Sequence, residues 1–161
     1  MNSMATALER KSKYELPRLK LTLVTESGSP SALYSIRTPD DVAEFFEPIR
    51  NLSEEHFATL HLNSRHEVIG LHEVSHGTLS ASLVHPREVF KAAMLANSHA
   101  LIVCHNHPSG GALTPSVEDM DTTTQLISAG RLLGIAILDH VILSPLHRLY
   151  SIRENHAELW E

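Results

Sequence analysis

The chain has 161 residues, of which 42% are hydrophobic and 20% are charged, and this is the composition of one globular domain that folds without disulfides. The single cysteine, Cys104, excludes an intrachain disulfide and fits a reducing compartment, and the N-terminus lacks the apolar centre of a signal peptide, so we expect a cytoplasmic protein. The net charge of -6 argues against broad electrostatic binding of nucleic acid, and no apolar run approaches the roughly 20 residues that span a membrane.

The N-terminal residues 1–35 are expected to form a tail with one possible strand at 19–24, where apolar and polar residues mostly alternate. The rest of the chain, residues 36–161, is expected to form the folded domain. Its first helix should begin at Pro39, because Thr38 is a suitable N-cap and proline is favoured at the first helical position. The side chains expected to be buried along this helix are Val42, Phe45 and Phe46.

The middle of the chain predicts a hairpin, a helix and a buried strand. Residues 57–62 and 67–74 have the composition of strands, and the four residues between them are few enough for a hairpin. A helix should begin at His85-Pro86, and the continuous apolar run 100–103 is typical of a strand that is buried on both faces. The buried stripe expected for this helix is Val89, Phe90, Ala93 and Met94.

A long helix is expected over residues 116–133, capped by Ser116 and stopped by Gly134. Strands at 135–143 and 148–152 complete the chain. This order of elements predicts an α/β domain with a mixed β-sheet flanked by helices. The side chains expected on one side of the long helix are Val117, Met120, Thr124 and Ile127.

The stretch HNHPSGGALTPSVED joins the buried strand to the long helix. His105 and His107 are two residues apart, so in an extended segment both imidazoles can reach one ion. Asp119 lies on the first turn of the helix and can face back toward them, although it also suits a capping role with Ser116. Two histidines and one aspartate leave a fourth position for water, which is the arrangement of a catalytic zinc site.

A water at such a site needs a base, and the best candidate in the sequence is Glu73, near the end of the second hairpin strand. We expect His72 and His76 to be spectators. His140 is expected to be a hydrogen-bonded core histidine, and Cys104 a buried thiol, because adjacent strand residues point to opposite faces.

The segments HNHPSG and TPSVED resemble the JAMM (MPN+) metalloprotease signature of an upstream glutamate, His-x-His and Ser-x-x-Asp. More narrowly, residues 37–152 resemble the bacterial RadC family, with support from EVSHGTLSASLVHPREVFKAAMLANSHALIVCHNHPSG and AGRLLGIAILDHVIL. One departure is an eight-residue gap between His107 and Ser116, where seven is usual. As a second departure, we expect the chain to lack the N-terminal helix-hairpin-helix region of longer relatives.

The resemblance implies the JAB1/MPN fold, similar in layout to cytidine deaminases, and hydrolysis of a peptide or isopeptide bond in a protein substrate. It also implies that His105, His107 and Asp119 bind one Zn²⁺ and that Glu73 takes the proton from the attacking water. Ser116 would help to hold the tetrahedral intermediate or the water. A role in DNA repair follows only from the family's name.

Three other functions share features with this pattern. A zinc deaminase would need His-x-Glu and Pro-Cys-x-x-Cys, and the chain has one cysteine. The letters His-Asn-His suggest an HNH nuclease, but the residues of that motif are dispersed rather than adjacent. A catalytically silent module that binds a protein partner remains the alternative, because the ligand residues alone do not establish turnover.

Overall fold

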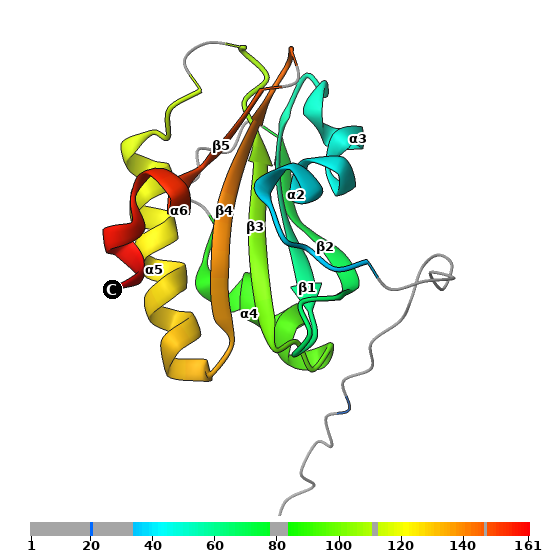
Figure 1. The fold of residues 1–161 in the computed structure, drawn as a ribbon, viewed down its shortest axis with the longest axis vertical. Coiled ribbons are helices and arrows are strands. Elements are labelled where there is room, and N and C mark those ends of the chain that lie inside the picture. The colour runs from blue at the N-terminus through cyan, green and yellow to red at the C-terminus, as the bar shows by residue number, and fades with distance from the viewer. Residues whose placement is uncertain (1–19, 21–33, 78–83, 111–112, 147) are drawn as a thin grey trace, which may run out of the picture.

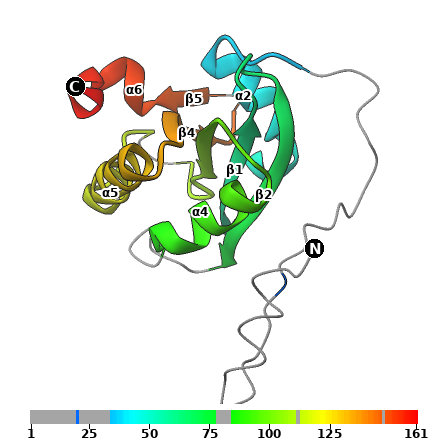
Figure 2. The same ribbon diagram turned by 90° about the horizontal axis from the view of Figure 1, so that it is seen from below.

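The structure, a computed structural model, describes residue 20 and residues 34–77, 84–110, 113–146 and 148–161. These residues form a five-stranded sheet in the order β2-β1-β3-β4-β5, with helices on both faces (Figures 1 and 2). Only β3 and β4 are parallel among the paired strands, so the predicted α/β fold with a mixed sheet is confirmed. The strands are β1 (Glu55–Leu62), β2 (Val68–Gly77), β3 (Ala100–Asn106), β4 (Ala136–Ser144) and β5 (Arg148–Ser151). The helices are α2 (Pro39–Phe45), α3 (Glu47–Arg50), α4 (Pro86–Leu95), α5 (Val117–Leu133), α6 (Ile152–Asn155) and the 3-10 helix η2 (Ala157–Trp160).

Helix ends lie where the sequence provides caps. The Thr38 hydroxyl accepts a hydrogen bond from the Asp41 backbone, and the Asp41 carboxylate accepts one from the Thr38 backbone, so a capping box begins α2. Ser116 caps α5 as predicted, and α4 begins at the predicted His85-Pro86, where His85 serves as its cap. Gly134 ends α5 in the left-handed region, with φ of 70°. The short helices α3 and α6 and the 3-10 helix were not predicted.

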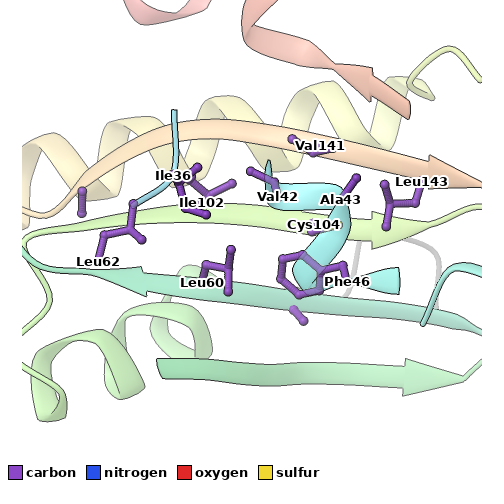
Figure 3. Close-up of a cluster of buried hydrophobic side chains, with 12 residues drawn as sticks. Ile36, Val42, Ala43, Phe46, Leu60, Leu62, Ile102, Cys104, Val141 and Leu143 are labelled. Atoms are coloured by element: carbon purple, nitrogen blue, oxygen red, sulfur yellow. The ribbon is translucent and has the colours of Figure 1, made fainter. Parts of the chain in front are cut away.

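One face of the sheet is covered by α2. Val42 of this helix and Phe46, the residue that caps its C-terminal end, are each 1% exposed and pack on side chains from β1, β3 and β4 (Figure 3). Phe45, predicted to be buried, is only partly so. Cys104 lies fully buried in the same cluster, as predicted, and burial raises the pKa of its thiol well above the usual value.

The opposite face is covered by α4 and α5, which lie together on one side of the sheet (Figure 2). Two predicted stripes are corrected here: Met94 of α4 is 54% exposed and Val117 of α5 is 73% exposed. Thr124 is also exposed. The buried face of α5 consists instead of Asp119, Thr122, Thr123, Leu126, Ile127 and Gly130. Four of these six residues are not large apolar residues, which is why apolar spacing placed the stripe incorrectly.

The helix α5 connects the parallel strands β3 and β4, so its first turn returns to the end of the sheet where β3 stops (Figure 1). Sites in α/β sheets favour this place, at the carboxyl ends of parallel strands. The strand predicted at 19–24 lies outside the described residues, apart from Lys20. Among the residues that the structure describes, no helix is both long and apolar enough to cross a membrane.

Candidate metal centre

His105 and His107 lie at the carboxyl end of β3. His105 is fully buried and its ring stacks on Phe57 of β1 at a centroid distance of 6.1 Å. His107 follows the strand, and its backbone N–H donates to the Leu143 carbonyl at 2.8 Å, which fixes the chain beside β4. The Nε2 atoms of the two histidines lie 2.9 Å apart. The sequence prediction that both imidazoles point to one place is therefore confirmed by their geometry.

Asp119 joins them from the first turn of α5. Its Oδ1 lies 3.3 Å from His105 Nε2, and its Oδ2 lies 3.5 Å from His107 Nε2. The carboxylate is oriented by the capping box, because Oδ2 also accepts hydrogen bonds from the Ser116 backbone and hydroxyl, each at 2.7 Å. The eight-residue gap thus leaves Asp119 within reach of both histidines.

A fourth residue, Glu55, completes the group, and it was not predicted from the sequence. One ligand atom from each of Glu55, His105, His107 and Asp119 lies within 4.8 Å of the others. Glu55 begins β1, two residues before Phe57, which pairs with His105 in the β1–β3 register. Residues i and i+2 of a strand share a face, so Glu55 stands on the side of the sheet that carries His105. The only local signal was an acidic pair, Glu54-Glu55, just before the strand expected at 57–62, because the pairing with His105 cannot be read from the sequence.

Glu73, the residue predicted as the base, lies elsewhere. The register pairs it with Ala58, which in turn pairs with Cys104, and cross-strand partners share a face. Glu73 therefore belongs to the face opposite His105. Its carboxylate is half exposed and lies 2.5 Å from Nδ1 of His56. The group of four that could hold a metal does not include it.

The charges of the group suit a cation. Burial lowers the pKa of His105 to about 4, so its imidazole is neutral at pH 7 and can offer a lone pair. Burial opposes ionisation of Asp119, but hydrogen bonds from His107 and Ser116 and the nearby His105 outweigh it and hold the pKa of Asp119 well below its usual range. Burial raises the pKa of Glu55, against the effect of His107 and together with that of Asp119. A raised pKa suits a carboxylate that accepts and returns a proton.

His140 of β4 is a fully buried core histidine, as predicted, and it contacts the group from behind. Its Nε2 lies 2.8 Å from His105 Nδ1, and its Nδ1 lies 2.6 Å from the Thr123 hydroxyl. It is not one of the four residues whose ligand atoms converge. Burial lowers the pKa of His140 well below its ordinary value.

Comparison with known proteins agrees with this geometry. The model of the RadC-like JAB domain matches residues 36–157, which is most of the chain. The chain belongs to the RadC-like JAB domain family. A UPF0758 protein of Desulfitobacterium hafniense is 43% identical over 151 residues, covering 93% of this chain and 63% of the relative. A UPF0758 protein of Alkaliphilus metalliredigens is 48% identical over 122 residues, covering 75% of this chain and 52% of the relative.

This chain thus spans less than two thirds of the length of these curated relatives. The names of the relatives state no activity, substrate or partner. The family membership supports the JAB/MPN fold, and the group of Glu55, His105, His107 and Asp119 could hold a metal ion.

Proposed function

We propose that this domain is a zinc-dependent hydrolase of peptide or isopeptide bonds in protein substrates. In this proposal His105, His107 and Asp119 hold one Zn²⁺, and Glu55 is the general base. The single observation that carries it is the convergence of two imidazoles and two carboxylates within 4.8 Å at the carboxyl end of β3. Family membership supports it, because JAB domains include metalloproteases.

The spacing of the three proposed ligands suits zinc. Ligand atoms held about 2.0–2.1 Å from a tetrahedral zinc ion lie roughly 3.3 Å from one another. The two Nε2 atoms lie 2.9 Å apart. His105 Nε2 lies 3.3 Å from Asp119 Oδ1, and His107 Nε2 lies 3.5 Å from Asp119 Oδ2. Nitrogen and carboxylate donors are a common set for zinc, and three protein ligands leave one position open for reaction.

The four residues divide the chemistry between them. Zinc held by such a set supplies Lewis-acid chemistry, since it acidifies water and polarises a carbonyl oxygen. Glu55 would accept a proton from the attacking water at its carboxylate and return it to the departing amine. Burial raises the pKa of Glu55, and a raised pKa favours a carboxylate that both accepts and returns a proton.

Ser116 has a positioning role in this proposal. Its hydroxyl donates to Asp119 Oδ2, so it orients one of the ligands. The role implied by the family resemblance, in which Ser116 holds the water or the tetrahedral intermediate, stays a prediction.

The test compares Glu55→Gln with the matched control Glu73→Gln on a proteome-derived peptide library and a panel of isopeptide-linked peptides, with cleavage read by mass spectrometry. Loss of a general base is expected to lower the rate by about 10²–10⁴-fold in Glu55→Gln, while Glu73→Gln keeps the wild-type rate. Unchanged cleavage in Glu55→Gln would show that another group is the base. Bound zinc without cleavage of any probe would favour the module that binds a protein partner.

A further inference from the structure

Behind the metal group a line of three buried side chains connects α5, β4 and β3. Thr123 Oγ1 lies 2.6 Å from the Asp119 carbonyl and 2.6 Å from His140 Nδ1. His140 Nε2 then lies 2.8 Å from His105 Nδ1. Thr123 is 1% exposed, and both histidines are fully buried. We call these three residues the Thr123–His140–His105 relay.

Each hydrogen bond of the relay needs one hydrogen, and the chemistry of Thr123 sets their direction. A carbonyl oxygen only accepts, and a hydroxyl carries one hydrogen, so Thr123 donates to the Asp119 carbonyl. The same hydroxyl must therefore accept from Nδ1–H of His140. A neutral imidazole carries one hydrogen, so His140 Nε2 is an acceptor and must receive the hydrogen on Nδ1 of His105.

We propose that Thr123 and His140 are positioning residues that hold His105 as the Nδ1–H tautomer, so that its Nε2 lone pair faces His107 and Asp119. The opposite direction of the relay would place the hydrogen on Nε2 of His105, and a nitrogen that carries a hydrogen cannot bind a metal. Metal-binding histidines commonly donate their other N–H to a fixed acceptor. Here that acceptor is a second histidine, which needs Thr123 to fix its own tautomer.

Apart from the Asp119 carboxylate, whose Oδ1 lies 3.3 Å from His105 Nε2, the surroundings of the relay leave few other ways to set these hydrogens. Phe57 packs against both rings, at 6.1 Å from His105 and 5.6 Å from His140 by ring centroid. Both histidines are fully buried, so solvent does not compete for their nitrogens. Thr123 is also one helical turn from Asp119 and bonds its carbonyl, so the relay connects the tautomer of one proposed ligand to the backbone of another.

The expected tautomer does not depend on whether the protein is an enzyme, but its effect on zinc rests on the proposed function. The variant Thr123→Val keeps the shape of the side chain and removes the hydroxyl. Thr123→Ser keeps the hydroxyl. Thr124→Val is the matched control, because the Thr124 hydroxyl makes the same kind of bond, to the Met120 carbonyl at 2.9 Å, but on the exposed face of α5.

The first measurement is long-range ¹H–¹⁵N NMR of histidine side chains in protein that has been stripped of metal by a chelator, with the His105 signals assigned through His105→Gln. We expect hydrogen on Nδ1 and a bare Nε2 in wild type, Thr123→Ser and Thr124→Val, and a mixture of tautomers in Thr123→Val. Hydrogen on Nε2 in the wild type, or a tautomer unchanged in Thr123→Val, would overturn the proposal.

The second measurement is zinc affinity by competition with a chromophoric chelator. Loss of the relay is expected to weaken zinc binding by about 10–100-fold in Thr123→Val and to leave it unchanged in Thr124→Val. Equal affinities in these two variants, both with wild-type thermal unfolding, would overturn the proposal. If the protein cleaves no peptide at all, the proposed reaction fails, while the tautomer and affinity results still decide the role of the relay.

Discussion

Ser116 and Asp119 form reciprocal hydrogen bonds across the first turn of α5. Asp119 Oδ2 accepts from the Ser116 backbone N–H and hydroxyl at 2.7 Å each, and Ser116 Oγ accepts from the Asp119 N–H at 3.0 Å. The same carboxylate lies 3.3 Å from His105 and 3.5 Å from His107. The hydrogen bonds that begin the helix therefore also orient a proposed metal ligand.

From this relationship we predict that Ser116→Ala lowers both stability and zinc affinity. Loss of the cap is expected to reduce the free energy of unfolding by about 0.5–2 kcal/mol, and loss of support for Asp119 to weaken zinc binding by about 10-fold or more. Urea unfolding without metal and chelator competition measure the two effects. Thr38→Ala removes the equivalent capping box of α2 and should reduce stability alone. Equal loss of zinc affinity in both variants would contradict the prediction.

Gly130 marks a close approach of α5 to the chain that follows it. A Cβ atom at this position would lie 2.5 Å from the Ile135 carbonyl oxygen and 3.3 Å from Phe90. Alanine normally stabilises a helix interior relative to glycine by about 1 kcal/mol. We predict the opposite sign for Gly130→Ala, with a loss of about 1–3 kcal/mol in the free energy of unfolding by urea denaturation. Ser128→Ala, on the exposed side of the same turn, is the control, and a stabilised Gly130→Ala would refute the close approach.

His61 makes the folded state sensitive to acid. It is 2% exposed, and its ring nitrogens lie 2.8 Å from Ser98 Oγ and 3.2 Å from Thr59 Oγ1. Burial, with a smaller effect of His72, lowers the pKa of His61 to about 4. Between the unfolded pKa near 6.5 and this value, the unfolded state binds a proton that the folded state does not, so stability falls as the pH falls.

We predict that His61→Gln reduces this slope by up to about 1.4 kcal/mol per pH unit between pH 6 and 4.5. Urea unfolding at a series of pH values measures the slope. His99→Gln, an exposed position, should leave the slope as in the wild type. A wild-type slope in His61→Gln would mean that His61 does not remain neutral in the folded protein.

Local signals account for much of what could be predicted from the sequence. Caps at Thr38 and Ser116, the helix start at His85-Pro86 and the stop at Gly134 place three helices correctly, because each depends on interactions within a few residues. The His105–His107 pair was found for the same reason, since two strand residues on one face need no distant partner to point the same way.

The residues that were missed or given the wrong role depend on contacts between distant segments. Glu55 joins the group only because Phe57 pairs with His105, 48 residues further along the chain, and no local pattern fixes that register. The β1–β2 register shifts by one residue between Phe57 and Ala58. This shift pairs Glu73 with Ala58 and so places it on the face opposite His105. Such bulges change which residues of a strand share a face with a neighbouring strand.

The buried face of α5 was misplaced for a related reason. Thr123 and Asp119 lie on it because their polar atoms find partners in the fold: His140 for the first, and Ser116 with two histidines for the second. A polar side chain is stable in the interior when it is hydrogen bonded, and the sequence of the helix alone does not reveal those partners.

The central claim is that His105, His107 and Asp119 bind one zinc ion. Elemental analysis of wild type, His107→Ala and the matched control His76→Ala, purified side by side, tests it most directly, because His76 is exposed and outside the group. We predict about one zinc per chain in the wild type and in His76→Ala, and loss of zinc in His107→Ala. Zinc retained in His107→Ala, or no zinc in the wild type after reconstitution, would contradict the claim.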